Sequence, residues 1–174
     1  LWRVLARLRM EGQDLPGATA AAQKAVENQP MNIQNYLVFA QVTGKAIDEA
    51  LTKGSEEQVR QLAQGLLDIT AQLEERSLAS AERQKRFPAY PRLELTPPLQ
   101  LALGKSLLLT GRLKEAEKPL LQAFSSEASR EESALWLHAL YTKQGRTAER
   151  QAMEVKPRAE SLQSPVYRAL LNWK

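Results

Sequence analysis

Apolar residues recur at intervals of three or four positions along most of the chain, which is the spacing that places them on one face of an α-helix. The clearest run steps from Val59 through Leu66 to Leu73, with polar residues between the apolar ones, and it can continue to Arg86. This pattern predicts one elongated helix in the middle of the chain, over residues 55–86. Similar spacing on both sides of it predicts an all-α protein.

Turn and capping residues mark the expected ends of these helices. The Ser-x-x-Gln at 55–58 is a possible capping box. The prolines at 88 and 91 predict an extended connector over residues 87–98, because proline removes a donor and disfavours helix in its predecessor. Thr96-Pro97 and Ser164-Pro165 each predict a cap followed by a first helical turn. Pro119 predicts a kink or a late helix start.

The connector over 87–98 has two interpretations. It could shape a groove, or it could only pack against neighbouring helices, and we favour packing. Its apolar anchors would be Phe87, Tyr90, Leu93 and Leu95.

Two pairs of segments repeat at an interval of 34 residues. Trp2-x-x-Leu5-Ala6 is followed by Tyr36-x-x-Phe39-Ala40, and the segment 103–111 is followed by the segment 137–145. Small residues in such a pattern allow two antiparallel helices to approach closely. The candidates for close approach are Ala6, Ala40 and Gly104 on first helices and Ala18, Ala25, Ala116 and Ala123 on second helices. The glycines expected to end first helices in the left-handed conformation are Gly12, Gly44, Gly111 and Gly145.

These residues resemble the tetratricopeptide (TPR) family, whose signature is W-x2-L-G-x2-Y, then A-x3-F, then P. The best match is Leu103–Leu107 with Gly111 and Ala116-x3-Leu120. The resemblance implies antiparallel helix-pair repeats stacked as a short right-handed superhelix, a TPR-like α-solenoid in a single domain. Its repeats would lie near 1–30, 31–86 (irregular), 97–128 and 131–154, with a C-terminal helix near 164–173. The second helix of the fourth repeat is in doubt, because Arg150 replaces the expected alanine.

The C-terminal helix has two open interpretations: it caps the last repeat, or the array continues beyond it. The chain begins at Leu1 and not at Met, which suggests a fragment of a longer protein.

Composition narrows the chemistry that this region can carry. The 174 residues contain no cysteine and one histidine, His138, which excludes disulfides, thiolate metal sites and histidine pairs. No nucleophile motif or phosphate-binding loop is present, and Gly104-Lys105-Ser106 lies inside a predicted helix. Adjacent carboxylates such as Asp48-Glu49 and Glu131-Glu132 are interpreted as solvated charges. We therefore expect no catalysis and no cofactor here, and no apolar run is long enough to span a bilayer.

A net charge of +4 raises the possibility of a nucleic-acid partner. The basic residues are, however, spread along the chain and interleaved with glutamates. The densest basic stretch, Arg83, Lys85 and Arg86, comes at the end of the predicted long helix, where cations complement the helix dipole. Binding of RNA or an anionic glycan is kept as an alternative that we do not favour.

The TPR resemblance implies a protein or peptide partner, bound on a concave surface lined by the first helices. The residues expected to be exposed on that surface are Gln34, Asn35, Val38, Gln41, Val42, Lys105, Ser106 and Leu109. Asparagine and glutamine could bond a peptide backbone. No run of basic residues suits a C-terminal carboxylate clamp. The identity of the partner, the oligomeric state and the cellular compartment stay open.

A second resemblance covers the segments 91–104 and 109–112. They are similar to the repeat regions that follow the membrane domain of bacterial O-antigen ligase or polymerase-like proteins. This similarity implies a soluble accessory domain on the cytoplasmic or extracytoplasmic side of an envelope polysaccharide enzyme. The membrane contact and the chemistry would then belong to a segment outside this sequence.

Overall fold

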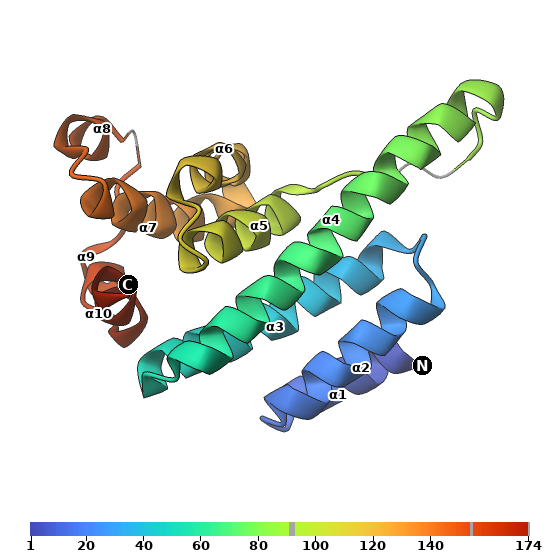
Figure 1. Ribbon diagram of the computed structural model, residues 1–174, viewed down its shortest axis with the longest axis horizontal. Helices are drawn as coiled ribbons and strands as arrows, with labels where there is room; N and C mark the ends of the chain where they lie inside the picture. The colour runs from blue at the N-terminus through green and yellow to red at the C-terminus, as the bar shows by residue number, and fades with distance from the viewer. Residues whose placement is uncertain (91–92, 154, 174) are drawn as a thin grey trace.

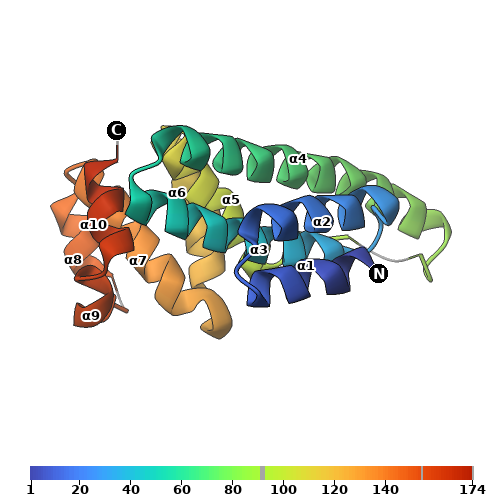
Figure 2. The ribbon, with the colours of Figure 1, turned by 90° about the horizontal axis from the view of Figure 1, so that it is seen from below.

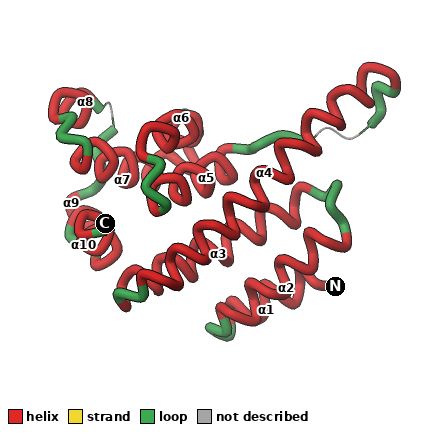
Figure 3. Tube along the Cα trace, in the orientation of Figure 1, coloured by secondary structure: helices red, strands yellow, loops and turns green. Residues whose placement is uncertain are grey.

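The computed structural model describes residues 1–90, 93–153 and 155–173, and within them the regular structure is entirely helical (Figures 1 and 3). Pro91 and Arg92, which begin the second resemblance, and residue 154 at the predicted end of the fourth repeat lie outside the described residues. The helices are α1 Trp2–Glu11, α2 Leu15–Asn28, α3 Ile33–Lys53, α4 Glu56–Arg86, α5 Pro97–Leu109, α6 Leu113–Phe124, α7 Glu127–Lys143, α8 Thr147–Ala152, α9 Ala159–Leu162 and α10 Pro165–Asn172. The all-α prediction is confirmed.

The elongated helix is confirmed as α4, which has 31 residues. Ser55 is its N-cap residue, but the serine side chain makes no capping hydrogen bond, so the predicted capping box is not formed. Thr96 likewise precedes α5 without a side-chain cap, whereas Ser164 accepts a hydrogen bond from the backbone N–H of Tyr167 at the start of α10. Pro119 lies inside an unbroken α6, so it does not mark a late start.

The prediction that Gly44 ends a helix is wrong. Helix α3 continues through it to Lys53 and ends at Gly54, whose φ is 70°. The buried Ile47 and Leu51 keep the helical spacing beyond Gly44, and their packing outweighs the roughly 1 kcal/mol that one interior glycine costs.

The other predicted turn glycines have mixed outcomes. Gly111 and Gly145 do take the left-handed conformation, with φ of 80° and 69°. Gly12 does not: its φ is −76°, and the neighbouring Gln13 adopts a φ of 62° instead.

Each of the first seven helices packs against the next one in sequence, and α1, α3, α5 and α7 also contact one another in that order. In Figure 1, α1 and α2 lie on one side of the long α3–α4 pair, and α5 to α10 lie on the other. The end of α4 extends past the neighbouring helices, as Figure 2 also shows. Helix α10 turns back to contact α3 and α7.

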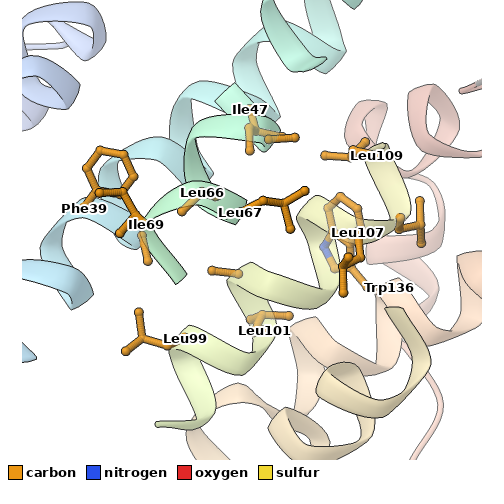
Figure 4. Close-up of a cluster of buried hydrophobic side chains, with 14 of the residues drawn as sticks. Phe39, Ile47, Leu66, Leu67, Ile69, Leu99, Leu101, Leu107, Leu109 and Trp136 are labelled. Carbon is orange, nitrogen blue, oxygen red and sulfur yellow. The ribbon is translucent and has the colours of Figure 1, made fainter. Parts of the chain in front are cut away.

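A part of the core lies where α3, α4, α5 and α7 meet. Figure 4 shows side chains from these four helices converging on this space. The labelled ones are Phe39, Ile47, Leu66, Leu67, Ile69, Leu99, Leu101, Leu107, Leu109 and Trp136. They are all buried, and they join the long α3–α4 pair to the helices that follow.

Small residues sit where the helix pairs approach most closely, as predicted. A Cβ atom built on Gly104 would lie 2.5 Å from Cγ of Leu120 across the α5–α6 contact. Ala6 and Ala18 are fully buried in the α1–α2 pair. The remaining candidates Ala25, Ala40, Ala116 and Ala123 are also buried.

The connector after α4 is anchored mainly through Leu93. Its side chain is buried, its N–H donates to Oγ of Ser80, and its carbonyl accepts from Oγ of Ser77. The expectation that Phe87 is a further anchor is wrong, since 66% of it is exposed.

Near the C-terminus, α8 has only six residues and buries none of them, which agrees with the doubt that Arg150 raised. No helix of the described residues has both the length and the apolar content needed to cross a bilayer.

Candidate functional site

A groove of about 330 Å³ lies between α3, α5 and α7, with α4 contributing one leucine to its wall. Its lining residues are Leu37, Ala40, Gln41, Gly44, Lys45, Asp48, Leu66, Pro98, Leu101, Ala102, Lys105, Ala128, Ser129 and Glu132. Most of its apolar members are buried toward the core, whereas Leu37 is half-buried and Pro98 and Ala128 are exposed, so the groove runs from the core of these helices to the surface. A wider hollow of about 500 Å³ between α2, α3 and α4 has Glu49 and Lys53 as its charged residues, and both are exposed.

The groove contains a charged cluster, which we call the ion centre: Lys105 of α5, Asp48 of α3 and Glu132 of α7. Nζ of Lys105 lies 2.8 Å from Oε1 of Glu132 and 3.4 Å from Oδ1 of Asp48. It also lies 4.8 Å from the ring centre of Trp136, within range of a cation–π contact. Lys105 is buried, whereas the two carboxylates reach the surface. The ion centre therefore joins three helices at the floor of the groove.

The electrostatics of the ion centre follow from its burial and its charge balance. Burial alone would lower the pKa of Lys105, but attraction to Glu132 and Asp48 outweighs it, and the pKa is raised above its ordinary value. The lysine is therefore charged at neutral pH. The pKa of the Asp48 carboxyl is also raised, first because it is desolvated and then because it faces the Glu132 carboxylate; its contact with Lys105 only partly offsets these effects. Two negative groups share one cation.

A glycine leaves the groove open beside the ion centre. Gly44 lies in the interior of α3, and a Cβ atom built on it would meet only Nζ of Lys105, at 4.0 Å. This distance is ordinary van der Waals contact, so no neighbouring atom requires a glycine at this position.

No protein-family model, curated protein or solved structure matches this chain.

The groove brings together two of the residues predicted for the concave surface. Gln41 and Lys105 both line it, although Lys105 is buried and not exposed as expected. Gln34 is exposed but lies outside the lining. A partner-binding role for any of these side chains stays a prediction.

The expected exposure is wrong for the remaining predicted residues. Val38, Val42, Ser106 and Leu109 are buried, because α3 and α5 are covered on several sides by neighbouring helices. Asn35 is also buried, and its Nδ2 donates to the carbonyl oxygens of Ala25 and Gln29 at 2.7 and 3.1 Å. It thus holds the α2–α3 turn together.

Sequence reasoning missed Asp48 and Glu132. Both belong to adjacent carboxylate pairs, and they lie 57 and 27 residues from Lys105, so no local spacing could have linked them to it. One signal was available. Lys105 is the one charged residue in the sequence of α5, and a charge within such an apolar helix needs a partner when it is buried.

His138 takes part in a contact away from the groove. Its Nδ1 lies 2.6 Å from the hydroxyl of Tyr167 on α10, and partial burial followed by repulsion from Arg150 lowers the pKa of the imidazole. Within the parts of the chain that the structure describes, no group of three or more histidine or acidic residues could hold a metal ion.

Proposed function

We propose that this chain is a TPR-like helical-repeat module that binds a segment of a partner protein in the groove between α3, α5 and α7. The observation that carries the proposal is the position of the groove on the helices that would be the first members of successive pairs. The contacts α1–α3, α3–α5 and α5–α7 support that assignment, because first helices of stacked pairs contact one another.

The volume of the groove suits side chains of a peptide more than a drug-sized molecule. Its composition is that of a binding site, with apolar walls and a few fixed polar groups. Here Leu37, Leu66 and Leu101 supply apolar surface, and Gln41 and the ion centre supply polar atoms. The volume is near the lower limit of ligand pockets, roughly 300 to 1,000 Å³. It would hold one or two side chains of an extended segment whose remainder lies along the helices.

Several basic side chains already have acidic or aromatic partners, which reduces the positive charge that they offer to a polyanion. At the end of α4, Lys85 pairs with Glu82, and Arg83 lies 5.6 Å from the ring centre of Tyr90. Elsewhere Arg146 pairs with Glu117. A surface that binds RNA or an anionic glycan needs cations free to meet phosphate or other anionic groups. For the accessory-domain alternative, no contact in the described residues speaks for or against a polysaccharide enzyme.

Filling the groove tests the proposal. Peptides are selected from a random linear library against the full chain, and their affinities for two variants are measured by fluorescence anisotropy. Gly44→Leu would place a side chain in the groove. Gly65→Leu adds the same side chain in the interior of α4, where a Cβ meets nothing within 4 Å, outside the groove lining.

We expect Gly44→Leu to lower the affinity for the selected peptides by at least about tenfold and Gly65→Leu to leave this affinity unchanged. Circular dichroism verifies that both variants keep the helical fold. Equal affinity of the peptides for the two variants would place binding elsewhere and refute the proposal. Failure to select any peptide would also count against it.

A further inference from the structure

The ammonium group of Lys105 has no free side for a ligand. It donates to Asp48 and Glu132 and lies over the face of Trp136, and only 5% of the residue is exposed. An ammonium group has three N–H donors, so these neighbours occupy the directions in which it can interact. An anionic ligand would have to displace a carboxylate to reach it. The lysine therefore holds the ion centre together and does not attract anions.

The two carboxylates, in contrast, face the groove and can still accept hydrogen bonds. The side chains of Asp48 and Glu132 are 38% and 51% exposed. Among the described residues, neither carboxylate has an ion pair or hydrogen bond other than the one with Lys105. Each carboxylate can accept several hydrogen bonds. The ion centre thus presents an excess negative charge and unused acceptors to whatever enters the groove.

Lys45 does not cancel this charge at the floor of the groove. It lines the groove from α3, but its side chain is exposed, and within the described residues it forms an ion pair with neither carboxylate. Long exposed lysines keep the ammonium group in water. The charge at the floor therefore comes from Lys105 and its two carboxylates, with one negative charge in excess.

We propose that the groove takes a basic segment and that an arginine side chain of this segment binds Oδ2 of Asp48 and Oε2 of Glu132, the two carboxylate oxygens to which Lys105 does not donate; this inference rests on the function proposed above. A guanidinium group presents five donors in a planar fork and can bridge two carboxylates. Its aliphatic stem would pack along apolar walls such as Leu37 and Leu101. The ligand is thus a partner protein segment whose anchor is cationic.

The charge of the anchor is tested with three pools of fluorescent peptides. Each pool has random flanking residues, blocked ends and one fixed central residue: arginine, citrulline or glutamate. Citrulline keeps the shape of arginine and removes its charge. Anisotropy titrations with the full chain are expected to show the arginine pool binding about tenfold more tightly than the citrulline pool. The glutamate pool is expected to bind most weakly.

Adjacent carboxylates on the same helices provide matched controls. Asp48→Asn and Glu132→Gln are each expected to reduce the affinity of the arginine pool toward that of the citrulline pool. Glu49→Gln and Glu131→Gln remove the same charge from the neighbouring positions, where the carboxylates pair with Lys53 and Arg158 outside the groove lining. These two variants are expected to keep the wild-type preference.

The outcomes separate this inference from the proposed function. If arginine and citrulline pools bind equally well and Gly44→Leu abolishes both, the cationic anchor is refuted while peptide binding in the groove stands. If all four carboxylate variants lower affinity equally, general charge attraction explains the preference and the anchor is again refuted. If no pool binds, or if Gly44→Leu binds every pool as well as the wild type, both ideas fail.

Discussion

The close contact between Gly104 and Leu120 leads to a quantitative prediction for Gly104→Ala. The new Cβ would lie 2.5 Å from Cγ and 2.7 Å from Cδ2 of Leu120, and 3.2 Å from its backbone nitrogen. Carbon atoms normally pack at about 3.5 to 4.0 Å, so the overlap exceeds about 1 Å. Leu120 is fully buried, and its backbone is fixed within α6, so neither can move away freely.

Two opposing effects set the magnitude. Overpacking of this kind costs about 1 to 3 kcal/mol, and the contact with a branched carbon and a backbone atom places Gly104→Ala near the upper end. Alanine is favoured over glycine in a helix interior by about 1 kcal/mol. We therefore expect a net loss of about 2 kcal/mol in the free energy of unfolding.

Gly65→Ala supplies the matched control. Gly65 lies inside α4, and a Cβ there would meet nothing within 4 Å, so this variant should gain up to about 1 kcal/mol. Urea denaturation followed by circular dichroism measures both variants. The expected gap between them is about 3 kcal/mol. If Gly104→Ala were as stable as Gly65→Ala, the close α5–α6 approach would be wrong.

Three further variants test other contacts. Asn35→Ala removes one of the two donors to the carbonyls of Ala25 and Gln29, each of which keeps a backbone N–H donor. The variant should cost about 1 to 2 kcal/mol of stability in urea. The pKa of Asp48 is raised in the folded state above its ordinary value of 3.8. Its contribution to stability therefore falls as the pH rises from 3.8 through the pKa of the folded state. The stability of Asp48→Asn relative to wild type should therefore increase over that range, measured by urea denaturation at each pH. The pKa of Glu117 is lowered, first by its hydrogen bond with Arg146, so its contribution is present above pH 4.5 and lost on acidification. Glu117→Gln should cost about 1 kcal/mol at neutral pH and almost nothing at pH 2, measured by thermal unfolding.

The sequence predicted those features of the fold that depend on neighbours in the chain. The spacing from Val59 to Leu73 identified the long α4, and Ser164-Pro165 identified the start of α10. The small residues at the helix contacts were also predicted, because a repeat of 34 residues aligns Ala6 with Ala40. All of these depend on the period of a helix or on its capping chemistry.

The sequence failed where distant residues decide the outcome. Gly44 resembled a turn glycine, but the buried residues that follow it keep α3 helical. Asn35 and Val38 seemed to be available for a ligand because an isolated helix pair would expose them, whereas packing against neighbouring helices buries them. Asp48 and Glu132 meet Lys105 only after three helices have assembled. The periodicity of one helix says which residues share a face, and not which neighbour will cover that face.

Two residues at the groove, Gly44 and Lys105, each make the fold less stable than another residue at the same position could. The glycine at 44 weakens the interior of α3 by about 1 kcal/mol relative to alanine, yet the added methyl group would fit without strain. The buried Lys105 has a large desolvation penalty, and buried ion clusters of this kind can often be replaced by apolar side chains without loss of stability. Gly104 shows the contrast, because its missing side chain is required by Leu120. Local departures from the most stable sequence that lack a packing reason are typical of functional sites. Their meeting at Gly44 and Lys105 supports the proposal that the groove is a binding site and not a packing defect.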